Sequence, residues 1–257
     1  ALAGMRVTLM GLGLFGGGVG AARFLAGRGA ELLVTDLRPP KRLAPSLAAL
    51  EGLPISYRLG EHVEDDLTGA DLVIANPAVP RANPYLRAAR RAGVPVASPM
   101  NLFLTLCPAR VAAVTGSNGK STTTALLAAM LEPIGRTVWL GGNIGVSLLP
   151  SLDRMAAQDL IVLELSSFQL QDAEALAWSP HMAVVTNLTP NHLDRHLDLR
   201  DYEEAKQVIW RFQGEDDFLV LNAGDPVLCD WVRRGVPSRL LFFGPAPEGG
   251  ELHVGMN

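Results

Sequence analysis

The chain has 257 residues, of which 48% are hydrophobic and 19% are charged, and its net charge is −4 at pH 7. This composition predicts a globular protein with a sizeable core and excludes a disordered chain. The negative charge disfavours a nucleic-acid partner, and no stretch is long and apolar enough for a membrane span, so neither partner is expected. Cys107 and Cys229 lie far apart, which indicates neither a disulfide framework nor a zinc knuckle.

The first hundred residues alternate short β-branched stretches with alanine- and arginine-rich stretches. The pattern predicts strands over 5–11, 30–36, 71–77 and 94–98, and helices over 18–29 and 83–93. The N-terminus lacks the basic segment and long apolar stretch of a secretory signal, so we expect a cytoplasmic protein. Alternating strands and helices predict an α/β fold with a parallel sheet, here a Rossmann-like domain over 1–98.

A glycine-rich turn follows the first predicted strand. GLGLFG supplies Gly11, Gly13 and Gly16, and Asp36 ends the next strand twenty residues after Gly16. This is the dinucleotide fingerprint, but its physics requires only a diphosphate at a helix N-terminus and an acid beside the adjoining nucleoside. Both NAD and a UDP-sugar satisfy it. A third interpretation is a glycine turn that serves tight packing alone.

Residues 98–109 form the expected connector, although Leu102, Phe103 and Leu104 are apolar enough that we expect them to pack. A second α/β unit is expected over 110–257. Its predicted strands are 111–116, 159–166, 181–188 and 217–222, with a glycine-rich turn and helix over 116–135.

The strongest local motif is TGSNGKST, between a predicted strand and a helix. Gly116 and Gly119 allow successive backbone N–H groups to surround an anion, and Lys120 can reach the outer phosphates of a nucleotide. Ser121 or Thr122 would contact Mg²⁺. The position of the first glycine in the strict Walker pattern is Val114, so that pattern is incomplete. The alternative is a glycine turn that caps a helix, with an exposed lysine.

Polar residues also follow the later strands. Glu164 stands where a predicted strand leaves the sheet, a place that suits a Mg²⁺ ligand, although a solvated glutamate is the more common case. His192 and His196 would share one face of a helix, which resembles zinc-ligand spacing. Oxygen-rich neighbours such as Asp194 favour Mg²⁺ over zinc, and a packing or surface histidine remains an alternative.

These motifs in this order resemble the Mur ligase family. The resemblance covers essentially the whole chain, through the segments GLGLFG, TDLR, GSNGKST, GGNIG, ELSSFQL, NLTPNHLDRH, EEAK and NAGD. ELSSFQL resembles the members that add D-glutamate. The family resemblance implies ATP and Mg²⁺ as cofactors, UDP-N-acetylmuramoyl-L-alanine and D-glutamate as substrates, a role in peptidoglycan synthesis and a monomer.

The resemblance also implies roles for single residues. Gly13 and Leu14 would bind the UDP diphosphate, and Asp36 would meet the uracil. The loop that holds the ATP phosphates would consist of Gly116, Ser117, Asn118, Gly119, Lys120, Ser121 and Thr122. Asn143 and His192 would contact the muramoyl-alanine substrate or its metal.

The family further implies a divalent metal centre. Ser121 and Glu164 would share one Mg²⁺, with His192 as a further metal contact. Lys206 matches a lysine that is carbamylated in this family, which converts a cation into a ligand for a second Mg²⁺ and requires a lowered lysine pKa. Lys120, Glu164, His192 and Lys206 are therefore the implied catalytic residues.

The implied reaction is ATP-dependent amide formation. ATP would phosphorylate the alanyl carboxylate, and the amine of D-glutamate would displace phosphate from the acyl phosphate. The sequence departs from the family at Leu37, where a hydroxyl residue would add a uracil contact, and at NPAVP over 76–80. It also stops before the C-terminal domain that binds D-glutamate, so we expect the chain alone to be inactive. The alternatives are an NAD-dependent oxidoreductase and a non-catalytic nucleotide-binding fragment.

Overall fold

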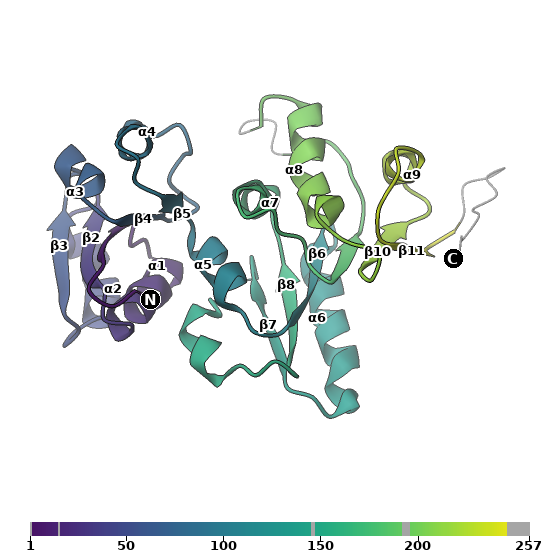
Figure 1. The fold of residues 1–257 in the computed structure, drawn as a ribbon, viewed down its shortest axis with the longest axis horizontal. Coiled ribbons are helices and arrows are strands. Elements are labelled where there is room, and N and C mark those ends of the chain that lie inside the picture. The colour runs from purple at the N-terminus through teal and green to yellow at the C-terminus, as the bar shows by residue number, and fades with distance from the viewer. Residues whose placement is uncertain (1, 15, 145–146, 192–195, 246–257) are drawn as a thin grey trace. The chain divides into compact units, whose positions relative to one another are not determined.

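The computed structural model of the chain describes residues 2–14, 16–144, 147–191 and 196–245. The described residues form two compact units (Figure 1). The first lies within Ala1–Leu106 and Gly145–Arg154, and the second within Cys107–Ile144 and Met155–Asn257. Each unit has its own sheet, and both sheets are parallel throughout their described strands. The expected α/β fold is confirmed.

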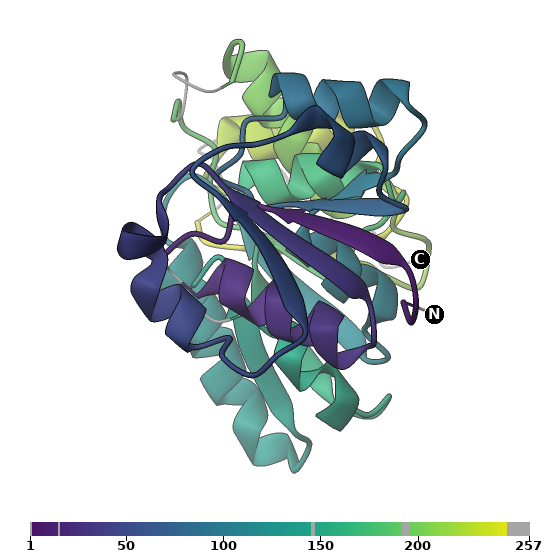
Figure 2. The ribbon, with the colours of Figure 1, turned by 90° about the vertical axis from the view of Figure 1, so that its left-hand side faces the viewer.

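The first unit carries a sheet with the strand order β3-β2-β1-β4-β5. Helices α1 and α2 cover one face of this sheet, and α3 and α4 cover the other (Figures 1 and 2). Its elements are β1 (Arg6–Met10), α1 (Gly17–Gly27), β2 (Glu31–Asp36), α2 (Pro40–Ala48), β3 (Ile55–Leu59), α3 (Glu64–Thr68), β4 (Leu72–Ala75), α4 (Pro84–Arg91), β5 (Val96–Ala97) and α5 (Pro99–Leu106).

The direction of strand addition reverses at β1 in this unit. The chain proceeds from β1 to β2 and β3 on one side, and then crosses back to β4 and β5 on the other side. Open parallel sheets bind ligands outside the carboxyl ends of their strands at such a reversal. The carboxyl ends of β1 and β4 therefore mark the position where this fold places a ligand.

The expected connector belongs to the first unit up to Leu106, and its last residues belong to the second. Its apolar residues form α5, in which Phe103 and Leu104 are buried, as their composition predicted. The 3₁₀ helix η2 (Leu149–Arg154) also belongs to this unit and contacts α1 and α5. Gly20 of α1 permits this approach, because a Cβ there would lie 3.2 Å from the Ser147 side chain. The alternation of strands and helices in the sequence gives no indication of this association.

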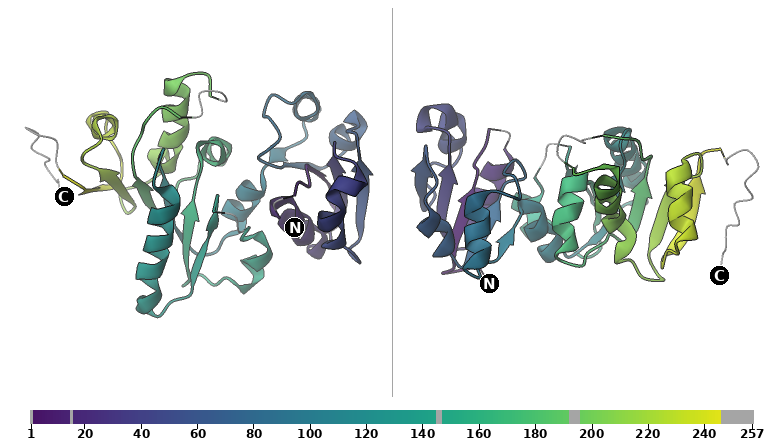
Figure 3. Two further views of the ribbon diagram at one scale, coloured as in Figure 1. Left: turned by 180° about the vertical axis from the view of Figure 1, so that it is seen from behind. Right: turned by 90° about the horizontal axis from the view of Figure 1, so that it is seen from above.

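The second unit carries a sheet with the strand order β11-β10-β9-β6-β8-β7. Helix α6 covers one face, and α7, α8 and α9 cover the other (Figures 1 and 3). Its elements are β6 (Arg110–Thr115), α6 (Lys120–Leu131), η1 (Glu132–Ile134), β7 (Val138–Gly142), β8 (Leu160–Glu164), α7 (Ser167–Glu174), β9 (Met182–Val185), α8 (Leu199–Arg211), β10 (Phe218–Asn222), α9 (Pro226–Arg233) and β11 (Arg239–Phe243).

The helices differ in how their first turns are capped. Side-chain caps begin several helices: the Asn83 side chain accepts from Tyr85 N in α4, and Ser166 forms a capping box with Gln169 in α7. Helices α1 and α6 instead begin after Gly16 and Gly119, which have φ of 82° and 78° and no side-chain cap among the described residues. The first N–H groups of these two helices are therefore available to an anion.

In the described ranges of the chain, no helix has the length and apolar character needed to cross a membrane.

Candidate functional site

The phosphate loop lies between β6 and α6 and is held by the loop that follows β9. Ser117 N donates to Asn187 O at 3.0 Å, and Asn118 N donates to the Asn187 side chain at 2.9 Å. Thr186 Oγ1 donates to Asn118 O at 2.6 Å. These contacts hold the backbone of the phosphate loop against the residues that follow β9.

The two glycines of the phosphate loop occupy positions that disfavour a larger residue. Gly116 has φ of 147°, and a Cβ at this position would lie 2.0 Å from Thr186 Oγ1. Gly119 takes the left-handed conformation that begins α6. Lys120 folds back over the loop, and its Nζ donates to Ser117 O at 3.0 Å. Ser121 and Thr122 are exposed on the first turn of α6.

Glu164 ends β8 and is almost completely buried, with 1% of its surface exposed. Its Oε1 accepts from Asn143 Nδ2 at 2.7 Å, and Asn143 N donates to Glu164 O at 2.8 Å. Its Oε2 is buried and has no hydrogen-bond partner among the described residues. The solvated glutamate of the sequence analysis is therefore wrong. A buried carboxylate with a free oxygen is costly, and it fits a cation ligand.

Lys206 lies inside the second unit, in the middle of α8, and 1% of its surface is exposed. Its Nζ donates to Gly116 O at 2.9 Å and to Thr115 Oγ1 at 3.2 Å, and it lies 4.7 Å from the centre of the Tyr202 ring. Burial, together with the nearby charge of Lys120, lowers the pKa of Lys206 to about 7, although the Glu164 carboxylate opposes the shift. A large part of the Lys206 amines is therefore neutral near pH 7.

This shift predicts a pH-dependent stability. An unfolded lysine has a pKa of about 10.4, so between pH 7 and pH 10 the unfolded chain binds more protons than the folded one, and stability rises with pH. We expect wild type to gain about 2 kcal/mol relative to Lys206→Met between pH 7 and pH 9. Urea unfolding at both pH values measures this difference. Exposed Lys41→Met should show no such gain, and a pH-independent difference for Lys206→Met would contradict the buried, depressed lysine.

A hydrogen-bond chain joins two of the sequence motifs. His196 Nδ1 lies 2.9 Å from Asp201 Oδ2, and His196 Nε2 lies 2.9 Å from Ser167 Oγ. The imidazole stacks on Phe168 and meets the edge of the Tyr202 ring. Ser167 is 2% exposed, which leaves no access for a substrate. These hydrogen bonds therefore hold the start of α7 against α8. Helix α7 begins shortly after Glu164, and α8 carries Lys206.

His196 lies before the start of α8 and is not part of a described helix. His192 itself lies outside the described residues, as does Asp194, and its expected role stays a prediction. Within the described ranges, no group of three or more His, Cys, Asp or Glu side chains forms a metal cluster.

The glycine turn of the first unit lies at the carboxyl end of β1. Asp36 is buried at the end of β2, and its carboxylate accepts from Gly13 N at 3.1 Å and from Arg38 N at 2.8 Å. Leu14 is half exposed beside this turn. The structure thus brings the glycine turn and the acid together, in the arrangement that both an NAD and a UDP-sugar interpretation require.

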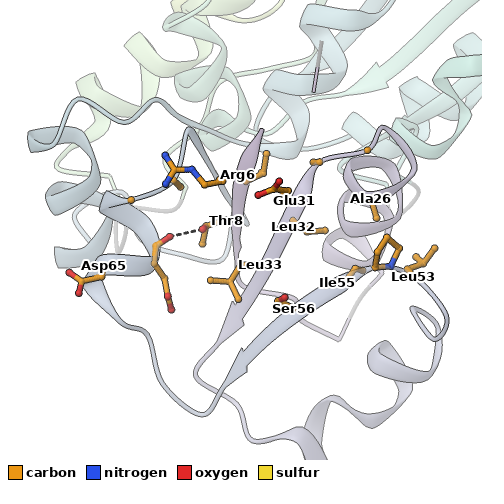
Figure 4. A pocket seen from close by; sticks show the side chains of 17 residues that line it. Arg6, Thr8, Ala26, Glu31, Leu32, Leu33, Leu53, Ile55, Ser56 and Asp65 are labelled. Carbon is orange, nitrogen blue, oxygen red and sulfur yellow. Dashed lines mark hydrogen bonds between the residues drawn. The ribbon is translucent and has the colours of Figure 1, made fainter. Parts of the chain in front are cut away.

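A hollow of about 990 Å³ lies at the opposite edge of the same sheet (Figure 4). Arg6, Glu31 and Ile55, the first residues of β1, β2 and β3, line it. Two polar groups at its wall are already paired: Thr8 Oγ1 donates to Asp66 O at 2.6 Å, and Arg6 forms an ion pair with Asp71 at 2.8 Å. Parallel sheets bind their ligands at the carboxyl ends of the strands, so we do not assign the hollow to the site.

Two family profiles match this chain. The MurD-like N-terminal domain of Mur ligases matches residues 5–98, and the Mur ligase middle domain matches residues 114–249. The chain belongs to the Mur ligase family. The reported relatives of this Mur ligase are ligases, and no finding supports an oxidoreductase.

Curated relatives agree with this membership. A UDP-N-acetylmuramoylalanine–D-glutamate ligase of Roseiflexus sp. (strain RS-1) is 44% identical over 255 residues, which are 99% of this chain and 55% of the relative. The enzyme of the same name from Symbiobacterium thermophilum is 38% identical over 245 residues, 95% of this chain and 53% of the relative. This Mur ligase chain therefore spans about half the length of these relatives.

Solved structures share the fold. A UDP-N-acetylmuramate:L-alanyl-gamma-D-glutamyl-meso-diaminopimelate ligase from Neisseria meningitides has a TM-score of 0.66 at 22% identity and covers 95% of this chain and 79% of its own. A UDP-N-acetylmuramate-alanine ligase from Thermotoga maritima has a TM-score of 0.57 at 24% identity, over 94% of this chain and 53% of its own. At these identities the likeness concerns the fold alone.

The sequence analysis missed several supporting residues of this Mur ligase. Thr186 and Asn187 bind the back of the phosphate loop, and Tyr202 contacts Ser117 Oγ at 3.1 Å. Asp201 orients His196. Their residue types give no local signal, because each acts across more than one element of the fold.

Proposed function

We propose that this Mur ligase adds D-glutamate to UDP-N-acetylmuramoyl-L-alanine at the expense of ATP, in peptidoglycan synthesis in the cytoplasm. The observation that carries the proposal is the buried, unpartnered Oε2 of Glu164, in the unit that carries the phosphate loop and the depressed Lys206. Two relatives that match nearly the whole chain bear the name of this activity. A non-catalytic nucleotide-binding role explains the loop but not the buried carboxylate.

The phosphate loop would bind ATP through its backbone N–H groups and Lys120. The first turn of α6 adds its free N–H groups and the partial positive charge of the helix N-terminus. Lys120 already lies against the loop, through its bond to Ser117 O, and it would turn toward the outer phosphates. Positive groups here would offset the repulsion between ATP and the alanyl carboxylate.

We propose that Mg²⁺ is held by four groups, namely Glu164, Ser121, Lys206 and His192. The donor set fits an oxygen-preferring cation: Oε2 of Glu164 is free, and Asn143 holds the other oxygen in place. Bound Mg²⁺ would neutralise phosphate charge and polarise the phosphoryl group. Lys206, neutral in part near pH 7, has the protonation state that reaction with CO₂ to a carbamate requires, which would make it an anionic ligand.

The first unit would hold the UDP part of the substrate. Gly13 and Leu14 would present backbone to the diphosphate at the start of α1, and Asp36 would lie beside the nucleoside. Asn143 would contact the muramoyl-alanine part. We propose residues 1–98 as the UDP-sugar domain and residues 110–257 as the ATP domain. D-Glutamate would bind to the part of the enzyme that corresponds to the remaining length of the relatives.

Thermal unfolding with UDP-N-acetylmuramoyl-L-alanine tests the first assignment. A ligand at 100 times its Kd stabilises the folded state by about 2.7 kcal/mol, so we expect a clear rise in melting temperature for wild type. Asp36→Ala and Gly13→Val should lose this rise, because they remove the acid and strain the turn. Asp65→Ala, at the hollow of Figure 4, should keep it. Stabilisation by NADH in place of the UDP-sugar would overturn the proposal.

The reaction itself is tested by phosphate release from ATP. The assay requires this chain to be joined to the segment that corresponds to the remaining length of its relatives. Release should depend on UDP-N-acetylmuramoyl-L-alanine and on D-glutamate together. Release that needs only one of them, or that follows another amino acid, would refute the proposed ligase activity.

A further inference from the structure

The NAGD segment, residues 222–225, follows β10 and has no role in the site described above. Its last residue, Asp225, is buried and directly precedes α9. The Oδ1 atom of Asp225 caps this helix, because it accepts from Val227 N at 3.0 Å and from Leu228 N at 3.2 Å. The Oδ2 atom accepts from Leu188 N at 2.7 Å. Asp225 therefore joins α9 to the residues that follow β9.

Residues 186–189, called the bracing segment here, hold the phosphate loop from the side of β9. The hydrogen bonds between them run from Thr186, Asn187 and Thr189 to Ser117 and Asn118, at distances of 2.6–3.0 Å. Leu188 lies between these residues, and its N–H donates to Asp225 instead. The bracing segment is therefore bonded to the phosphate loop on one side and to α9 on the other.

The bond between Asp225 and Leu188 lies inside the protein. Leu188 is 5% exposed and Asp225 is 8% exposed, so an N–H group left without its acceptor here would have no water to replace it. A carboxylate acceptor also makes this a charge-assisted hydrogen bond. Helix α9 is a firm anchor for the carboxylate, because its Leu228 and Trp231 are fully buried.

A second residue of the NAGD segment supports the same place. Asn222 Nδ2 donates to Thr186 O at 3.0 Å, at the start of the bracing segment. Thr186 in turn donates to Asn118 O of the phosphate loop. The two polar side chains of the NAGD segment thus contact the bracing segment at two of its four residues.

We propose that Asp225 is a positioning residue for ATP, which sets the conformation of the phosphate loop through Leu188. The inference rests on the proposed function, which makes this loop the ATP site. A purely structural role as the cap of α9 would use Oδ1 alone and would not explain the bond from Oδ2 to Leu188. The capping and positioning roles therefore belong to different oxygens of one carboxylate, and substitutions can separate them.

Titration of the chain with ATP in the presence of Mg²⁺ tests the proposal. In Asp225→Asn the amide oxygen can still cap α9, but the amide N–H₂ group would face Leu188 N, so that two donors meet. Asp225→Ser is a second variant that keeps a capping oxygen and leaves Leu188 N unpaired. Both should bind ATP about tenfold more weakly, as expected if the loop keeps its binding conformation for about a tenth of the time.

Amide hydrogen exchange followed by NMR gives a local measurement that a capping role alone would not change. Asn118 N donates to the Asn187 side chain at 2.9 Å, so its exchange should become faster by about tenfold or more once the bracing segment is released. Val227 N is held by the cap and should keep its wild-type exchange rate in Asp225→Asn.

Asp159→Asn is the matched control, because Asp159 is also a buried carboxylate of the second unit. Its Oδ2 accepts both from Trp139 Nε1 at 2.8 Å and from Ala156 N at 3.0 Å, so a single amide oxygen can take over both bonds. It precedes β8, at the opposite edge of the sheet from the phosphate loop. This variant should bind ATP as wild type does.

The outcomes separate the inference from the proposed function. Wild-type ATP affinity in both Asp225 variants would overturn the role of Asp225 and leave the proposed function standing. An equal loss of affinity in Asp159→Asn would also overturn it, since the loss of any buried charge would then suffice. Unchanged exchange at Asn118 despite weaker ATP binding would exclude the route through Leu188. Failure of wild type to bind ATP would overturn the proposed function and this inference with it.

Discussion

Gly116→Ala is expected to abolish ATP binding by this chain and to lower its stability by about 3–5 kcal/mol. A Cβ at this position would lie 2.0 Å from Thr186 Oγ1 and 3.2 Å from the Asn187 backbone. The phosphate loop and the segment that follows β9 would have to move apart. This movement would break the hydrogen bonds that hold Asn118. Urea unfolding measures the stability, and calorimetric titration with ATP measures the binding.

A matched glycine and a second substitution sharpen this experiment. Gly135 has φ of 77° with no atom within 4 Å of its added Cβ, so Gly135→Ala should cost only about 1–2 kcal/mol and leave ATP binding intact. Thr186→Ala removes the clashing oxygen, and in the Gly116→Ala background it should restore part of the lost stability. Wild-type ATP affinity in Gly116→Ala would show that this loop is not the phosphate site.

Glu164→Gln is expected to stabilise the chain and to weaken its Mg²⁺-dependent ATP binding about 100-fold. The carboxylate is buried, and one of its oxygens has no partner among the described residues. Removal of this charge should raise the free energy of unfolding by about 1–2 kcal/mol in the absence of metal. The gain in stability and the loss of metal dependence should therefore appear in the same variant.

The measurements are urea unfolding without metal and ATP titration with and without Mg²⁺. Glu132→Gln, at an exposed position after α6, changes the charge equally and should alter neither quantity. A Glu164→Gln variant that is destabilised and still binds ATP in a Mg²⁺-dependent way would indicate that the carboxylate is structural. If wild type bound ATP equally weakly with and without Mg²⁺, that result would also contradict a role for the metal in ATP binding.

The fold class and the phosphate loop could both be predicted from the residue pattern alone. The strands β1, β2, β4, β5, β6, β8, β9 and β10 lie within or close to the predicted ranges, because each is a short stretch of strand-forming residues bounded by turn residues. The sequence analysis did not identify β3, β7 and β11, which are partly exposed edge strands with weaker patterns. The phosphate loop was predictable because its glycines, lysine and hydroxyl residues lie within eight consecutive positions.

The chemical state of the site, in contrast, depends on contacts that form only in the folded chain. Lys206 is buried against Gly116, 90 residues earlier in the chain, and no local pattern shows which face of a helix receives such a partner. The free oxygen of Glu164 and the hydrogen bond between Ser167 and His196 are likewise set by neighbours from other elements. Local sequence encodes secondary structure and turn geometry, whereas burial, protonation and pairing follow from which distant residues the fold brings together.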